Sequence, residues 1–486
     1  RDATEKFWQF HSKAVLDKTA KPFLIGSVAT SDPRANEEPE TEDKDEIDPL
    51  EETYFGDLVP FGDPFWYQDW SSPYYKDSHR KVRRAVRDFT DTYLTPNAHA
   101  WDEAKEIPRD EYKRVADFGI LAAVAAGGTG WPTEYAEGIP VPGGIDPSEW
   151  DAFHNLILLD ELSRCGSGGI TYGILGGFGI SIGPILHYGS TELKRRLVGP
   201  LLRGEIRSCL AITEPSGGSD VANLVTDAKR VEGRDGGARY VVNGEKKWIT
   251  GGIYSDVFVT AVRTGGKGMG GVSLLVVERT NGVRTRKMDC MGVWASGTSF
   301  VEFDDVEVPE GNVLGKVNKG FPVIMANFGG ERVGIAIQAN RFARVCLEES
   351  IVYASKRKTF GKPLIEHPVI RSKIASMAQK IEATHAWIES IVYQSTQYDS
   401  DSIAFRGGGA MALLKAAATE TFTFCATEAA MIFGGLAYSR GGQGEKIERL
   451  YREVLAYSVP GGSLDIMKDI GVRQHVKIAQ ILGAKL

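Results

Sequence analysis

The segment LAITEPSGGSDVANL, residues 210–224, is the stretch of sequence that is most informative about the fold. It starts as an apolar strand and changes after Thr213 into a run of small and polar residues. Gly217 and Gly218 carry no Cβ, so backbone N–H groups there can approach a ligand closely, and Thr213 and Ser219 add hydroxyl donors. An ordinary turn after a strand has a similar composition, because Gly, Ser and Asp gather in plain turns.

The chain before this segment is helical in pattern. Apolar residues recur at helical spacing from near His79, beginning a predicted N-terminal α-helical domain over residues 74–204. Pro96 is expected to end the first of its helices, because proline lacks the N–H that a helix interior needs.

Around and after the segment the pattern changes twice. Short alternating runs such as DVFVTAV, VSLLVVE and FVEFDDVEV predict an antiparallel β domain over residues 205–315, with a hairpin turn at Asn243-Gly244. Long helical patterns then return and predict a C-terminal α domain over residues 316–486. The predicted fold class is therefore α+β, in the order α, β, α.

The first 73 residues differ from the rest. Residues 1–35 resemble the second half of a cytochrome b5-like haem domain, in which His11 matches one of two axial ligands, but the half with the HPGG motif is absent. Haem is therefore expected only if an intact domain of that kind lies upstream. Residues 36–73 combine an acidic run with an aromatic stretch and predict a solvated linker followed by a strap on the main body.

Composition excludes several classes of function. A formal charge of −7 argues against nucleic-acid binding. The five cysteines form no CxxC pair, which argues for a reducing compartment and against a metal site. The uncharged run 166–187 is long enough to span a membrane, but its eight glycines favour a buried element and no membrane span.

Two motifs carry a family resemblance. ITEPSGGSD, residues 212–220, resembles the TEPGAGSD signature of the acyl-CoA dehydrogenases, and GEKKWITGG, residues 244–252, is similar to their GxKxWITNG. The likeness continues in RKTFGKPLIEH and in IFGGLAYSRGGQGEKIERLYREV, and it extends from near residue 75 to the end. It implies an FAD-dependent enzyme whose C-terminal domain is a four-helix bundle.

The resemblance also implies which residues contact FAD. Those implied to lie against the flavin ring are Leu210, Ile212, Thr213, Gly218, Ser219, Trp248, Ile249 and Thr250. Those implied to contact the dinucleotide, in part across a subunit boundary, are Arg357, Thr359, Phe360, His367, Gly434 and Gly435. A homodimer or homotetramer follows from the second set.

The catalytic base departs from the commonest family pattern. Many members use a Glu in a C-terminal YEGT motif, whereas YSVPGGSLDIM has Gly461 at that position, where only a backbone N–H can assist the substrate carbonyl. A minority, including members acting on long-chain or branched acyl groups, have a Glu before an Arg on another helix, which matches Glu331 and Arg332. We predict that Glu331 removes the α-proton of an acyl-CoA while hydride goes to flavin N5, and that Ser219, Ser296 and Arg332 bind the substrate.

Other functions stay open from the sequence. An acyl-CoA oxidase would pass electrons to O₂, and a catalytically silent FAD-fold protein would serve as an electron-transfer partner. A nitroalkane oxidase-like enzyme would need an Asp where Gly461 stands. The electron acceptor is a flavoprotein, a haem domain or O₂. The final Ala484-Lys485-Leu486 resembles a peroxisomal address, with mitochondrion and cytoplasm as alternatives.

Overall fold

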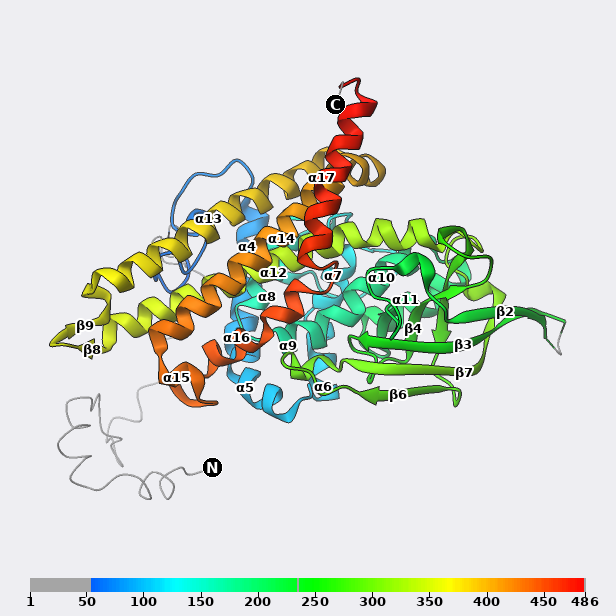
Figure 1. Ribbon diagram of the computed structural model, residues 1–486, viewed down its shortest axis with the longest axis horizontal. Helices are drawn as coiled ribbons and strands as arrows, with labels where there is room; N and C mark the ends of the chain where they lie inside the picture. The colour runs from blue at the N-terminus through cyan, green and yellow to red at the C-terminus, as the bar shows by residue number, and fades with distance from the viewer. Residues whose placement is uncertain (1–53, 234–235, 485–486) are drawn as a thin grey trace, which may run out of the picture. The chain divides into compact units, whose positions relative to one another are not determined.

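The structure, a computed structural model, describes residues 54–233 and 236–484, which lie in one compact unit (Figure 1). The b5-like remnant with His11, the acidic run and the last two residues of the C-terminal tripeptide lie outside the described residues.

The first domain is helical. Its helices α4, α8 and α10 bury long faces, and Asp151 caps α8 by accepting hydrogen bonds from the N–H groups of Phe153 and His154. The α-helices of this domain are α4 (Asp77–Phe89), α5 (Thr95–Ala104), α6 (Arg109–Asp117), α7 (Ile120–Ala126), α8 (Ala152–Ser163), α9 (Gly168–Thr171), α10 (Gly177–Tyr188) and α11 (Thr191–Leu202).

The prediction that Pro96 ends a helix is wrong. Helix α4 continues through a π-helical turn, Thr90–Leu94, directly into α5, and Pro96 lies in the first turn of α5. The hydrogen bond that Pro96 cannot donate would go to Thr92, which lies inside the π turn, where the regular i→i−4 pattern is already interrupted.

The middle domain is a seven-stranded sheet in the order β1-β4-β2-β3-β7-β6, with β5 on β4. Its pairs are antiparallel except those of β4 with β1 and, at one residue pair, with β2. The pattern had not indicated β2 or β6. The strands are β1 (Ser208–Ala211), β2 (Asp227–Glu232), β3 (Ala238–Ile249), β4 (Val257–Arg263), β5 (Val272–Glu278), β6 (Val283–Lys287) and β7 (Ser299–Pro309).

The predicted hairpin turn at Asn243-Gly244 is also wrong. Strand β3 runs through both residues, and its register against β7 shifts between Val242 and Gly244, which marks an irregularity of the bulge type. Gly244 has φ +143°, and a Cβ on it would lie 2.7 Å from the Cα of Thr226. The glycine thus serves a close approach inside the sheet, a role that the local Asn-Gly pattern does not distinguish from a turn.

The glycine-rich run forms a buried helical segment. Residues Gly168–Tyr188 are long and apolar enough to cross a membrane by length and composition, yet 61% of that window is buried in the structure, as in a core helix. A π-helical turn, η7 (Tyr172–Gly176), separates α9 from α10. A Cβ on Gly177 would lie 3.0 Å from the carbonyl oxygens of Ser208 and Thr250, so the glycines allow close packing on the β domain.

The C-terminal domain is a bundle of long helices in which α12 packs along α14 (Figure 1). A small hairpin of β8 (Lys358–Thr359) and β9 (Lys362–Pro363) follows α12. The helices are α12 (Gly320–Lys356), α13 (Pro368–Gln397), α14 (Ser400–Phe433), α15 (Gly435–Tyr438), α16 (Glu445–Ser458) and α17 (Leu464–Ile481).

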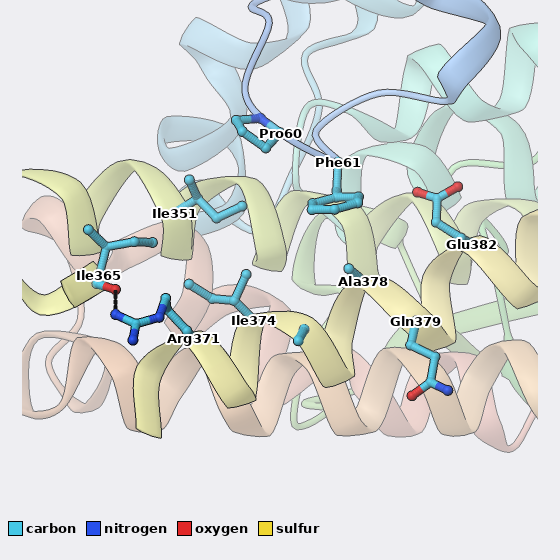
Figure 2. A pocket seen from close by; sticks show the side chains of 10 residues that line it. Pro60, Phe61, Ile351, Ile365, Arg371, Ile374, Ala378, Gln379 and Glu382 are labelled. Carbon is cyan, nitrogen blue, oxygen red and sulfur yellow. Dashed lines mark hydrogen bonds between the residues drawn. The ribbon is translucent and has the colours of Figure 1, made fainter. Parts of the chain in front are cut away.

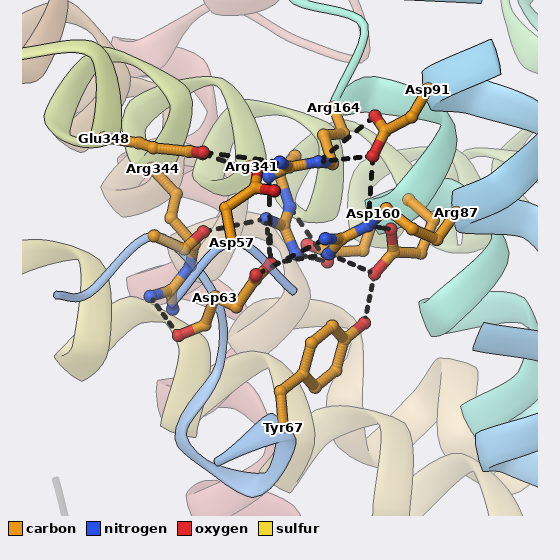
Figure 3. Close-up of polar contacts among 12 residues, drawn as sticks. Asp57, Asp63, Tyr67, Arg87, Asp91, Asp160, Arg164, Arg341, Arg344 and Glu348 are labelled. Atoms are coloured by element: carbon orange, nitrogen blue, oxygen red, sulfur yellow. Dashed lines mark hydrogen bonds and ion pairs between the residues drawn. The ribbon is translucent and has the colours of Figure 1, made fainter. Parts of the chain in front are cut away.

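The aromatic strap before α4 is tied to the helices by buried ion pairs (Figure 3). Asp63 is 3% exposed and accepts hydrogen bonds from Arg87 of α4 at 2.7 Å and from Arg341 of α12 at 3.1 Å. Arg341 also pairs with Asp160 of α8. One ionic cluster therefore joins the strap, the N-terminal helical domain through α4 and α8, and the C-terminal domain through α12.

Candidate functional site

The first part of the site is the loop after β1. Lys246 of β3 is fully buried, and its Nζ donates to the Ile212 carbonyl at 3.0 Å and to the Glu214 carboxylate at 2.8 Å. Glu214 in turn accepts the N–H groups of Val225 and Thr226 at 2.6 and 2.9 Å. A buried ion pair thus holds the loop in place, and the sequence motif had not indicated it.

The predicted ring-binding residues occupy this loop and the end of β3. Leu210 and Ile212 bury their side chains in the core, so they offer only their backbone, whereas Ser219 is exposed. Within the described residues, the hydroxyls of Thr213, Ser219 and Thr250 have no hydrogen-bond partner. These unused donors beside a turn without bulky side chains fit a flavin ring.

The second part is the turn after β3. Trp248 adopts φ +59° and is half-exposed, whereas Ile249 is buried. The Lys247 N–H donates to the Thr213 carbonyl at 2.9 Å, which joins the two predicted flavin motifs. The structure therefore brings residues 213 and 248–250 close together.

The π turn η7 has one end beside Thr250 and the other near Glu331. A Cβ on Gly176 would lie 3.0 Å from Thr250 Cγ2, so Thr250 packs directly on the turn. At its other end, burial and the nearby carboxyl of Glu331 raise the pKa of Tyr172. Sequence reasoning missed η7; π turns often occur at functional sites, but helical periodicity does not show them.

Glu331 lies on α12 beside Gly461, although 130 positions separate them in sequence. A Cβ on Gly461 would be 3.8 Å from Glu331 Oε1. The Glu331 residue as a whole is half-buried, but its Oε2 is sealed from solvent and has no hydrogen-bond partner within the described residues. A buried acceptor without a partner is costly and needs an explanation, and a catalytic role is one that its place beside Gly461 supports.

The surroundings keep this carboxyl ready to exchange a proton near neutral pH. Burial raises the pKa of Glu331 to about 7, against the charges of Arg332 and Lys415, which lower it. A base with a pKa near the working pH is the most effective kind.

Two of the predicted substrate-binding side chains, Arg332 and Ser296, already form hydrogen bonds with other residues of the chain. Arg332 Nε donates to the Gly461 carbonyl at 3.1 Å, so one of its donors holds the turn. Ser296 is fully buried, and its hydroxyl pairs with that of Thr298 at 2.8 Å.

The dinucleotide set lies elsewhere in the same chain. Arg357 caps the end of α12, about 26 residues from Glu331, or ~39 Å at 1.5 Å per residue. Phe360 at the β8–β9 tip is 96% exposed, and Thr359 pairs with His367. The remaining two members, Gly434 and Gly435, sit at the same end of α12, next to the stacked rings of Tyr353 and Phe433.

A further feature of the structure is an apolar groove (Figure 2). It has a volume of about 490 Å³ and lies between the strap and helices α12 and α13. None of the predicted site residues lines it; those that do include Phe61, Ile351, Ile374 and Ala378.

One cluster within the described residues has metal-ligand types: His79, Asp151 and His154. The Lys76 N–H donates to Nδ1 of His79, so that ring carries its proton on Nε2, which donates to Asp151 at 3.0 Å. Asp151 also caps α8. A histidine that binds a metal through one ring nitrogen usually donates the N–H of the other to a partner. Here both ring nitrogens of His79 already have partners within the protein, so the cluster is a structural hydrogen-bond network.

Sequence comparisons agree with the three-part architecture. Models of the acyl-CoA dehydrogenase N-terminal, middle and C-terminal domains match residues 76–205, 209–306 and 318–475. Acyl-CoA dehydrogenase AFT10-1 of Alternaria alternata is 39% identical over 427 residues, covering 87% of this chain and 97% of that protein. The chain belongs to the acyl-CoA dehydrogenase family.

Solved structures share the fold. Acyl-CoA dehydrogenase from Geobacillus kaustophilus is 28% identical, with a TM-score of 0.72, over 83% of this chain and 100% of that one. An acyl-CoA dehydrogenase complexed with FAD from Bacillus anthracis, 24% identical, has a TM-score of 0.74 over 85% of this chain and 69% of that one. Members of the family are FAD-dependent oxidoreductases, so this chain is an enzyme of that class with FAD as its cofactor.

Proposed function

We propose that this enzyme oxidises the α,β bond of an acyl-CoA thioester, with Glu331 as the base and with long-chain or branched acyl groups favoured. The observation that carries the proposal is the buried, unpartnered Oε2 of Glu331 beside Gly461. The preference for long or branched chains rests on the position of the base, which is on α12 and not in the C-terminal turn.

Each residue has a defined part in the reaction. Glu331, as the carboxylate, takes the α-proton, and the Gly461 N–H donates to the thioester oxygen, where negative charge develops. Tyr172 and Ile335 lie near this carboxyl, and its burial keeps its pKa high. When bound, FAD supplies the acceptor for the β-hydride.

The test is an anaerobic titration of the FAD-loaded protein with a panel of acyl-CoAs of different length and branching. Loss of the oxidised flavin absorbance with a subset of them supports the function and defines the chain length. A flavin unchanged by every member would refute it. Hydrogen peroxide release on turnover in air would instead identify an oxidase.

The rate of flavin reduction should depend on pH through Glu331. Only the carboxylate accepts a proton, so the rate should be low below the pKa of about 7, rise through it and level off above it. Stopped-flow reduction from about pH 4 to about pH 9 measures this, because the range includes the ordinary pKa of an exposed glutamate. A rate limb near the ordinary pKa of an exposed glutamate would contradict the assignment.

We further propose that FAD binds between two subunits, because the ring-binding and dinucleotide sets lie apart in one chain. Arg357 is exposed, and within the described residues its guanidinium has no hydrogen bond or ion pair. An arginine of this kind suits a pyrophosphate.

Arg357→Ala should therefore weaken FAD retention by about tenfold or more, since a charge-assisted hydrogen bond contributes roughly 1.5–3 kcal/mol. The FAD-to-protein ratio after gel filtration at decreasing concentration measures this. Arg473→Ala is the control, because this exposed arginine pairs with Asp469 on its own helix. A wild-type monomer that holds one FAD per chain would contradict the shared site.

A further inference from the structure

The turn that carries Gly461 is held by two cations from different helices. Lys415 of α14 is fully buried, and its Nζ donates to the carbonyls of Ser458 and Gly462, each at 2.7 Å. Arg332 of α12 holds the carbonyl between them, that of Gly461, at 3.1 Å. The turn has no regular structure of its own, because α16 ends at Ser458 and α17 begins at Leu464.

The backbone of this turn needs such support. Gly461 and Gly462 adopt φ +66° and +107°, and glycine is the residue with the largest choice of conformations. Without the two cations, three carbonyl groups of the turn would lose these hydrogen bonds, and the direction of the Gly461 N–H would no longer be set. Lys415 contributes two of the three bonds.

We infer that Lys415 is a positioning residue for the reaction: it holds the Ser458–Gly462 turn so that the Gly461 N–H faces the thioester oxygen, and its charge acts on Glu331. The roles of the thioester oxygen and of Glu331 in this inference rest on the proposed function. The hydrogen bonds that hold the turn are independent of it. Neither of the paired flavin motifs nor the Glu-Arg pattern indicated this residue.

Lys415 is one of the two cations that lower the pKa of Glu331 within the part of the chain that the structure describes. Among the described residues, the groups that act on Glu331 are Arg332 on its own helix, Lys415 on α14 and Tyr172 on η7. Tyr172 stays neutral, because burial and the Glu331 carboxyl raise its pKa, and its OH donates to the Ala456 carbonyl. Burial lowers the pKa of Lys415 to about 8, with Glu331 opposing this, so the ammonium is present when the carboxylate forms.

Three substitutions separate the two roles. Lys415→Met removes charge and donors, Lys415→Gln keeps an amide donor without charge, and Lys415→Arg keeps both. Lys468→Met is the matched control, because that lysine is exposed on α17 and pairs with Glu420.

In Lys415→Met, the plateau rate of flavin reduction at high pH should fall about tenfold or more, because the Gly461 N–H loses its direction. The acidic limb should also move up by about 1 pH unit, since a cation that favours the carboxylate is gone. Lys415→Gln should show the same shift with part of the plateau rate restored. Lys415→Arg and Lys468→Met should keep the wild-type limb.

A second measurement does not depend on turnover. Infrared difference spectra of the substrate-free, FAD-loaded enzyme, with Glu331→Gln as the reference, follow the protonated carboxyl band of Glu331 against pH. A higher midpoint in Lys415→Met or Lys415→Gln supports the inference even if no acyl-CoA reduces the flavin, a result that would refute only the proposed function. An unchanged midpoint and an unchanged rate limb in a folded Lys415→Gln would overturn it.

Discussion

Replacing Glu331 by Gln should lower the rate of flavin reduction by an acyl-CoA at least about 10²-fold, the lower end of what a general base contributes. FAD and ligand binding should persist, because Gln has nearly the same shape and Glu331 makes no hydrogen bond through Oε2 within the described residues. The pH limb near 7 should disappear with the carboxyl. Stopped-flow reduction and a ligand titration of the flavin spectrum measure both effects.

A second-site variant sharpens this test. Gly461→Glu in the Glu331→Gln background places a carboxyl within reach of the same substrate carbon, because a Cβ at position 461 lies 3.8 Å from Glu331 Oε1. Recovery should be partial: φ is +66° there, and that Cβ meets Ile335 Cδ1 at 2.7 Å. Gly461→Ala is the control, since it adds the crowding without the carboxyl. Rapid reduction by Glu331→Gln alone would refute Glu331 as the base.

Asp63→Ala should destabilise the protein by about 3–5 kcal/mol, the range for a buried ion pair that loses one partner. Burial raises the pKa of Asp63, but Arg87, Arg341 and Arg164 lower it more, so it stays well below its usual range. The carboxylate therefore stabilises the fold at neutral pH, and this contribution is lost only as the pH falls below the ordinary aspartate value.

The effect of Asp63→Ala is measured as the shift of the urea midpoint of the FAD-loaded enzyme, followed by circular dichroism. Glu420→Ala is the control: its partner Lys468 is half-exposed, and exposed pairs contribute about 0–1 kcal/mol. Equal shifts for the two variants would show that the ionic cluster of the strap adds nothing beyond a surface pair.

Local patterns in the sequence were enough for the family, the order of its domains and the flavin motifs. The residue types of the Thr213 loop and of the turn at Trp248, such as Gly218 and Thr250, lie within two short motifs, so the motifs could be recognised without coordinates. The combination of Glu331 with Gly461 also came from the sequence, through the family resemblance.

Only the tertiary structure decided how the distant parts combine. Gly244 is a point of close packing in β3, because Thr226 lies against it. The Asn-Gly pattern alone does not indicate this contact. The pKa of Glu331 depends on burial by other elements, and Lys415 meets the Gly461 turn across the bundle. The sequence by itself therefore determined which chemistry this protein carries, while long-range packing, which sets burial, register and distance, decided which residues hold that chemistry in place.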